Sequence, residues 1–287
     1  MMKIFRFLPD KLYITLQYLR YAKCFPNWKN PKTFNEKLQW LKLYDRQDAY
    51  TTMVDKYLVK DYVAKLVGRE YIIPTLGVWD TASEIDFDKL PDKFVLKWNH
   101  DSGSVIICND KSTFDRQDAV NKLNKWQDHN GFWYGREWPY KNVKPRIIAE
   151  KYMEDDSDNH LLKDYKIFCF DGVPKTIMTV TGGHDDEEKI LRRMYDTEWN
   201  LLPIGLHGHE AVEEAELKPE KLQEMLKLAQ ILSAGIPHIR TDFYLVNNQI
   251  YFGELTFYHM SGFGKMAPPE WEETFGSWIK LPMKRED

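Results

Sequence analysis

Two short segments near the end of the chain constrain its fold more than any other part of the sequence. Residues 239–246 and residues 249–256 each alternate apolar and polar side chains, and asparagines at positions 247 and 248 separate them. Two asparagines between alternating segments are a strong signal for a turn that joins antiparallel strands. The sequence therefore predicts a β-hairpin in this part of the chain.

Four polar side chains of this hairpin are candidates for one site. Alternation puts Arg240 and Asp242 on one face of the first strand, and Glu254 and Thr256 on one face of the second. Oxygen ligands of this kind suit Mg²⁺, which proteins usually hold through one or two carboxylates plus phosphate oxygens. A half-exposed surface hairpin with a cross-strand salt bridge shows the same alternation. The hairpin alone leaves both interpretations open.

A second candidate site lies upstream, in residues 94–107, which are typical of a strand, a loop of small residues and another strand. Lys97 near the end of the first strand can place a positive charge on a phosphate. Gly103 tolerates a positive φ, so that backbone N–H groups of the loop, which also contains Ser104, can approach phosphate oxygens. The loop matches neither a Walker motif nor a dinucleotide fingerprint.

Between these two sites, residues 146–153 form an apolar segment that runs into polar residues. Its last four residues, Glu150, Lys151, Tyr152 and Met153, are candidates for a hinge whose backbone contacts the edge of an adenine. Taken alone, the segment is an ordinary core strand.

In combination, these segments resemble the ATP-grasp superfamily, and more narrowly its TupA-like branch, which is associated with bacterial surface polysaccharide and teichuronopeptide synthesis. The resemblance covers nearly the whole chain. In chain order it is carried by residues 30–42, Asp55-Lys56-Tyr57, Lys97, Glu150 to Met153, Asp164-Tyr165-Lys166, Arg240 and Asp242 with Glu254 and Thr256, and Ser261-Gly262-Phe263.

The resemblance implies an α+β protein with the ATP-grasp fold, in which two α+β lobes sandwich ATP. We expect a helical N-terminal region at residues 1–70, a central lobe at residues 71–149 with the Gly103 loop, and a C-terminal lobe at residues 150–287 with the hinge and the hairpin. The sequence pattern also predicts helices at residues 115–127 and 219–232, and a pair of strands within residues 164–181.

The resemblance also implies roles for individual residues. The expected Mg²⁺ ligands are Asp242, Glu254 and Thr256; the expected ATP-binding residues are Lys56, Lys97, Gly103, Ser104, Glu150, Lys151, Tyr152, Met153 and Lys166. Arg240 is expected to stabilise a tetrahedral oxyanion.

Two departures from the family pattern stand out. The superfamily's hairpin usually ends in Glu-x-Asn, whereas this chain has Thr256 at the last position. A hydroxyl there can still bind a metal or hold its water. In addition, residues 181–188 lie where a basic residue aimed at the γ-phosphate is expected, and Arg192 and Arg193 are the candidate substitutes.

The reaction implied by the family is ATP-dependent activation of a carboxylate as an acyl phosphate, which an amine then converts into an amide. In a polysaccharide setting the carboxylate belongs to a uronic acid or an amino acid, and the amine to an amino acid or an amino sugar. Two other classes stay open. Relatives are often described as glycosyltransferases, although no Asp-x-Asp motif follows a nucleotide-binding βαβ unit here. An ATP-grasp kinase would use the same Mg-ATP cradle.

Composition limits the partners and the compartment. A net charge of −4 argues against nucleic acid as a primary partner, because proteins that bind phosphate backbones carry a basic stripe. Three isolated cysteines fit a reducing compartment, and no segment has the length and apolarity of a membrane span or the pattern of a secretory signal. We therefore expect a cytoplasmic protein.

Residues 1–23 qualify this expectation because they combine basic and apolar residues in an amphipathic helical pattern. Such a helix can pack on its own protein with its lysines outward. It can also lie on an anionic membrane surface, here the inner face of the cytoplasmic membrane.

Overall fold

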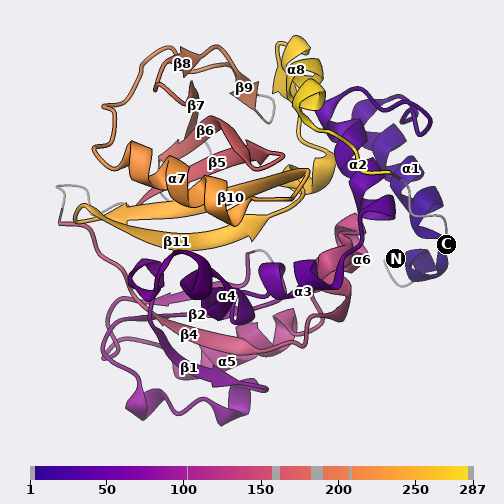
Figure 1. Ribbon diagram of the computed structural model, residues 1–287. Helices are drawn as coiled ribbons and strands as arrows, with labels where there is room; N and C mark the ends of the chain where they lie inside the picture. The colour runs from indigo at the N-terminus through magenta and orange to yellow at the C-terminus, as the bar shows by residue number, and fades with distance from the viewer. Residues whose placement is uncertain (1–3, 102, 157–161, 182–189, 207–208, 284–287) are drawn as a thin grey trace.

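Two antiparallel sheets, one above the other in Figure 1, form the framework of the protein. The computed structural model describes residues 4–101, 103–156, 162–181, 190–206 and 209–283. The N-terminal helices lie beside and between the sheets, and the chain passes from the lower sheet to the upper one after residue 151. Helices and antiparallel strands together give the α+β class that the sequence predicts.

The smaller sheet has the strand order β1-β4-β2-β3. Its strands are β1 (Thr75–Trp79), β2 (Phe94–Trp98), β3 (Val105–Cys108) and β4 (Ile147–Lys151), and the connections contain η3 (Ala82–Glu84), η4 (Phe87–Lys89), α5 (Arg116–Trp126), α6 (Gly131–Gly135) and η5 (Trp138–Asn142). Buried Phe94, Leu96 and Trp98 of β2 form a core with Leu123 of α5. The indole N–H of Trp98 donates to the carbonyl of Leu123 at 3.0 Å, which fixes α5 against the sheet.

The larger sheet has the order β11-β10-β5-β6-β7-β8. Its strands are β5 (Lys163–Phe170), β6 (Val173–Thr181), β7 (Leu191–Asp196), β8 (Leu201–Leu202), β10 (His238–Val246) and β11 (Gln249–Thr256); β9 (Gly205–Leu206) pairs separately with β12 (Met266–Ala267). Helix α7 (Leu222–Leu232) covers one face of this sheet, as Figure 1 shows, and η7 (His259–Gly262) and α8 (Glu270–Trp278) follow β11.

The N-terminal region is helical, as predicted, and contains η1 (Ile4–Phe7), α1 (Asp10–Ala22), α2 (Phe34–Tyr44), α3 (Asp48–Val54), α4 (Leu58–Val67) and η2 (Arg69–Tyr71). A capping box starts α2, because Thr33 accepts from the backbone N–H of Glu36 while the Glu36 carboxylate accepts from that of Thr33. Phe34 and Leu38 of α2 lie in the same core as Phe168 and Phe243 of the larger sheet. Helices α2, α3 and α4 therefore share the core of the larger sheet.

The remaining sequence predictions can be compared with these bounds. The helices expected at residues 115–127 and 219–232 are confirmed as α5 and α7, and the strand pair within residues 164–181 is confirmed as β5 and β6. The expected lobe boundary at residue 150 falls one residue before the end of β4, and the three-part division of the chain stays a proposal. Within the described residues, no helix has the length and apolarity needed to cross a membrane.

Candidate active site

The predicted hairpin is confirmed, and its turn has the backbone conformation that such hairpins need. Asn247 and Asn248 have φ values of 50° and 60°, which match the type I′ turn that asparagine favours. Across the pair of strands Asp242 lies opposite Glu254, and Arg240 lies opposite Thr256. The four polar residues therefore share one face of the sheet.

A β-bulge brings about this register. Val246 pairs with Gln249, so a regular ladder would place Asp242 opposite Gly253, but the register shifts between Asp242 and the next residue. The extra residue puts Glu254 opposite Asp242. A Cβ on Gly253 would lie 3.1 Å from the carbonyl oxygen of Asp242, so glycine fits this close approach.

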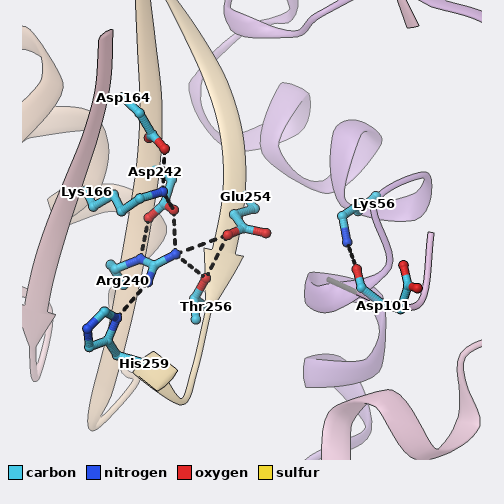
Figure 2. Close-up of polar contacts among 9 residues, drawn as sticks. All are labelled: Lys56, Asp101, Asp164, Lys166, Arg240, Asp242, Glu254, Thr256 and His259. Atoms are coloured by element: carbon cyan, nitrogen blue, oxygen red, sulfur yellow. Dashed lines mark hydrogen bonds and ion pairs between the residues drawn. The ribbon is translucent and has the colours of Figure 1, made fainter. Parts of the chain in front are cut away.

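Arg240 is the centre of the hairpin's polar network (Figure 2). Its Nε donates to Asp242 Oδ1 at 2.7 Å and its NH2 donates to Asp242 Oδ2 at 2.6 Å, which is a bidentate pair. The same NH2 lies 3.0 Å from both Glu254 Oε1 and Thr256 Oγ1, and NH1 lies 2.8 Å from His259 Nδ1. Burial opposes the charge, but Asp242 and Glu254 raise the pKa of Arg240 above its ordinary value.

Lys166 and Asp164 extend this network onto β5. Lys166 lies opposite Asp242 in the ladder, and its Nζ donates to Asp242 Oδ2 at 2.8 Å and also pairs with Asp164. Burial raises the pKa of Asp242, but the stronger combined effect of Arg240 and Lys166 holds it below its ordinary value. Asp164 lacks such strong support, and burial raises its pKa to about 6.

A second cluster of charges lies at the end of the smaller sheet. Glu150, only 5% exposed, accepts from Lys97 Nζ at 2.5 Å and from Lys60 Nζ at 2.6 Å. Burial alone would raise the pKa of Glu150, but the two lysines hold it below its ordinary value. This cluster is therefore a carboxylate with a cation on each side.

Lys56 joins the two clusters. It follows α3, and its Nζ donates to the backbone carbonyl of Asp101, on the far side of the view from the hairpin in Figure 2. Burial lowers the pKa of Lys56. Glu254 of the hairpin raises it, Lys97 of the second cluster lowers it, and Glu150 of the second cluster raises it. Charges of both clusters therefore act on this one ammonium group.

The loop after β2 contains a left-handed glycine beside open space. Gly103 has a φ of 99°, and nothing lies within 4 Å of the position where its Cβ would be. Ser104 is 3% exposed, and its hydroxyl donates to the carboxylate of Asp101. The loop thus offers open space beside a left-handed glycine, where a ligand can approach the backbone.

The other candidate residues lie at various distances from this centre. After Glu150, Lys151 is exposed and Tyr152 is half-buried, whereas Met153 packs with Ile73 and with Val246 of β10. The segment therefore contacts both sheets, which is where a hinge is expected.

Strand pairing separates the two candidate arginines. Arg192 lies opposite Val180, which lies opposite Asp164, and so Arg192 shares the sheet face of the hairpin network, three strands from β10. Arg193 is on the other face, where its NH1 lies 2.8 Å from Glu216 Oε1. Residues 182–188 of the expected γ-phosphate segment lie outside the described residues.

The donor set agrees with Mg²⁺ on the hairpin. Asp242, Glu254 and Thr256 present oxygen atoms side by side, and Glu254 Oε2 has no hydrogen bond among the described residues, in a side chain that is 36% exposed. No group of three or more His, Cys, Asp and Glu in the described ranges could hold a metal on its own. Binding through Asp242 requires exchange of a contact with Arg240 or Lys166.

Sequence reasoning missed two residues of these clusters. Lys60 pairs with Glu150, and its position four residues after Lys56, at the start of α4, was an available signal. His259 contacts Arg240 from η7, beyond the end of β11. Its position depends on how the chain turns after the hairpin, for which the sequence contains no periodic signal.

Comparisons with solved structures give distant similarities. D-alanine–D-alanine ligase from Bacillus anthracis shows 16% identity and a TM-score of 0.41 over 72% of this chain and 57% of that one. N5-carboxyaminoimidazole synthetase from Staphylococcus aureus shows 12% identity and a TM-score of 0.44 over 80% of this chain and 53% of that one. D-alanine–D-alanine ligase from Helicobacter pylori shows 13% identity and a TM-score of 0.45 over 88% of this chain and 68% of that one. The chain thus spans little more than half the length of the first two proteins.

A search of curated protein sequences gives no match. The comparison with protein families is specific, because residues 36–280 match the model of the TupA-like ATP-grasp family. This range includes both sheets, the hairpin network and the lysine cluster. The chain therefore belongs to the TupA-like ATP-grasp family and has the ATP-grasp fold.

Proposed function

We propose that the protein is an ATP-dependent carboxylate–amine ligase that works through an acyl phosphate. The observation that carries this proposal is the charge of Glu254, which contacts Arg240 and also acts on the half-buried Lys56, together with Lys97 and Lys60, which pair with Glu150. A triphosphate with its metal ion is bound by lysines, which neutralise phosphate oxygens, and by carboxylates, which coordinate the metal.

Each group has a role in this proposal. Lys97 and Lys56 bind phosphate oxygens, together with the backbone of the Gly103 loop, and residues 150–153 hold the adenine. Mg²⁺ on Asp242 and Glu254 supplies positive charge that neutralises the phosphate oxygens. Arg240, held in one orientation by Asp242, donates to the oxyanion that develops when the acyl phosphate is attacked. Arg192 is the better placed of the two arginines to approach the γ-phosphate.

Ligand-dependent melting tests the nucleotide. We expect Mg-ATP to raise the melting temperature, because a ligand that binds only the folded state stabilises it by mass action. UDP-glucose should have no such effect. Stabilisation by UDP-glucose and none by ATP would favour a glycosyltransferase.

Product analysis with γ-labelled ATP tests the reaction. A ligase releases free phosphate together with an amide, whereas a kinase transfers the label to a hydroxyl. Asp242→Asn and Glu254→Gln should abolish turnover while the fold is retained, because each removes a charged ligand with little change in size. Asp61→Asn is a matched control, since its side chain is 74% exposed on α4. Wild-type turnover in both site variants would show that the charged residues of the hairpin have only a structural role.

The proposed setting is bacterial surface polysaccharide synthesis, with peripheral contact of residues 1–23 with the membrane. Part of α1 packs on the protein itself, as one of the two interpretations predicts, because Tyr13, Ile14 and Tyr18 are buried. On the outer side of the helix, Leu12 and Leu16 are 46% and 47% exposed. These leucines, with neighbouring basic residues, support the membrane proposal.

A further inference from the structure

A cavity of about 750 Å³ lies between α1, α6 and the segment around η7. Aromatic rings make up much of its wall: Tyr13, Tyr21, Trp133, Tyr134, Tyr140 and Phe263. A cavity of this size accommodates a small molecule, and aromatic walls with a few polar groups are typical of such sites. None of the residues proposed above for ATP lies in this wall, so the cavity is available to another substrate.

Two carboxylates, Asp101 and Glu137, also belong to the wall. Asp101 connects the cavity to the proposed phosphate site, because its backbone carbonyl accepts from Lys56. Its side chain is buried, and Oδ2 has no hydrogen-bond partner among the described residues. A buried carboxylate oxygen without a partner is costly, and a ligand that donates a hydrogen bond would remove that cost.

Glu137 lies where the cavity meets the hairpin network. Burial raises its pKa and the charge of Lys42 lowers it, and the charges of Glu254 and Arg240 also act on it. Burial raises the pKa of Tyr140 in the same wall, Glu137 and Glu254 raise it further, and Arg240 lowers it. Glu137 also lies near Ser261 of η7, the element whose His259 contacts Arg240 of the hairpin network.

Lys42, the cation whose charge acts on Glu137, makes its hydrogen bonds to other groups. Lys42 Nζ is occupied by the carbonyls of Gly135 and Ser261 at 2.7 and 2.6 Å and by the Ser261 hydroxyl at 3.1 Å. A Cβ on Gly135 would lie 1.9 Å from Ser261 Oγ and 3.1 Å from Glu137 Oε1, so glycine keeps this corner of the cavity open.

We propose that the cavity binds the amine substrate of the ligase and that Glu137 accepts the proton that the amine loses. This inference rests on the proposed function. Carboxylates and aromatic faces both attract an ammonium group, and this cavity offers both beside the reaction centre. Arg20 and Gln17 of α1, which also line it, can bind polar groups elsewhere on the same substrate.

The ammonium group bound in the cavity first gives one proton to the carboxylate of Glu137. The lone pair of the neutral nitrogen then attacks the carbonyl carbon of the acyl phosphate and forms the C–N bond. The C–O bond to phosphate breaks, and inorganic phosphate leaves with the electron pair and takes the second proton of the nitrogen. A carboxylate whose pKa is raised is a better base than an ordinary one, provided that it is ionised.

Binding of a simple amine tests the site without the reaction. Benzylamine combines an ammonium group with a ring, and benzyl alcohol is its uncharged counterpart. We expect saturation-transfer NMR to detect benzylamine in preference to benzyl alcohol. Glu137→Gln, which keeps the size of the side chain, should weaken benzylamine binding about tenfold or more. Tyr134→Ala should also weaken it, and Glu198→Gln, on an exposed turn, is the matched control.

Equal binding of benzylamine to wild type and Glu137→Gln would overturn the assignment. Another result separates the amine site from the ligase proposal. If Mg-ATP does not stabilise the protein while benzylamine binding depends on Glu137, the amine site is supported and its role in a ligase reaction is contradicted. Melting curves of each variant show whether the fold is retained.

Hydroxylamine tests the proton-accepting role. It is unprotonated near neutral pH and traps acyl phosphates as hydroxamates without a base, whereas ordinary amines must lose a proton. With ATP and a panel of hexuronic and amino acids, Glu137→Gln should lower the ratio of amide to hydroxamate by about a hundredfold. An unchanged ratio would contradict the role. If no acid gives a hydroxamate, the ligase proposal and Glu137's role as a base both fail.

Discussion

Arg240 shows how one side chain can organise a site through its geometry. Its planar guanidinium spans both oxygens of Asp242 and still reaches Glu254, Thr256 and His259. A lysine in this place would keep the charge but lose the fork that makes these contacts together.

We therefore expect Arg240→Lys to bind Mg-ATP nearly as well as wild type and to lose on the order of a hundredfold or more in kcat. Calorimetric titration and steady-state kinetics measure the two quantities. Arg192→Lys, on the same face but three strands away, is a useful comparison. Collapse of ATP affinity with an unchanged kcat would make Arg240 a nucleotide-binding residue.

Glu272 gives a prediction about pH and stability. It accepts from the side chain of Asn35 at 2.8 Å, and burial raises its pKa to about 7. Between its ordinary pKa and this value the folded protein keeps a proton that the unfolded chain releases, so this group makes the protein less stable as pH rises.

Urea unfolding at about pH 5 and about pH 8 measures this effect. Wild type should lose stability between these two pH values, and we expect this loss to be about 2 kcal/mol smaller in Glu272→Gln. Glu273→Gln, the exposed neighbour, should behave as wild type. If the free energy of unfolding changes equally with pH in wild type and Glu272→Gln, Glu272 has an ordinary pKa in the folded protein.

At the residue scale, alternation predicted that Asp242 would meet Glu254, and the structure confirms it. Alternation alone does not explain this pairing, because a regular ladder without the bulge would turn Glu254 to the opposite face of the sheet. Lys97 was predicted from its place at a strand end, whereas Glu137 was not, since only tertiary packing brings residues 131–140 beside η7.

At the scale of elements, the bulge in β11 can be tested by changing its length. Deletion of Gly253 should leave Glu254 and Thr256 opposite Asp242 and Arg240, because a regular ladder then gives the same pairing. Insertion of a second glycine after Gly253 leaves two surplus residues and should turn Glu254 away or distort the strand.

We expect the deletion to retain Mg-ATP turnover and the insertion to lose about a hundredfold or more. Turnover is compared with melting temperature for each variant, so that lost activity is separated from lost fold. A folded but inactive deletion variant, or a fully active insertion variant, would show that register is not what the bulge provides.

Most helices and strands could be predicted because each carries its own signal. The Asn-Asn turn, the helical periodicity at residues 219–232 and the cap before α2 are local features. The strand order β11-β10-β5-β6-β7-β8 and the pairing of β9 with β12 depend on contacts between distant segments. No local pattern records those contacts.

At the scale of the whole molecule, exposed Leu12 and Leu16 test the membrane proposal. Wild type should sediment with vesicles that contain phosphatidylglycerol, less so in about 0.5 M salt, and not with neutral vesicles. Replacement of both leucines by serine should abolish sedimentation while Mg-ATP still stabilises the protein. Replacement of exposed Leu66 and Ile231, which lie outside residues 1–23, is the control.

The shared core of the N-terminal helices and the larger sheet sets the timing of folding on the ribosome. Asn35 of α2 meets Glu272 of α8 across 237 positions of sequence, and Phe34 packs against Phe275. At ordinary rates of synthesis, roughly 10 to 50 s pass between the emergence of these partners. During this interval the apolar side of α2 lacks the C-terminal residues that cover it in the folded protein. This part of the nascent chain is therefore prone to aggregation until α8 has been synthesised.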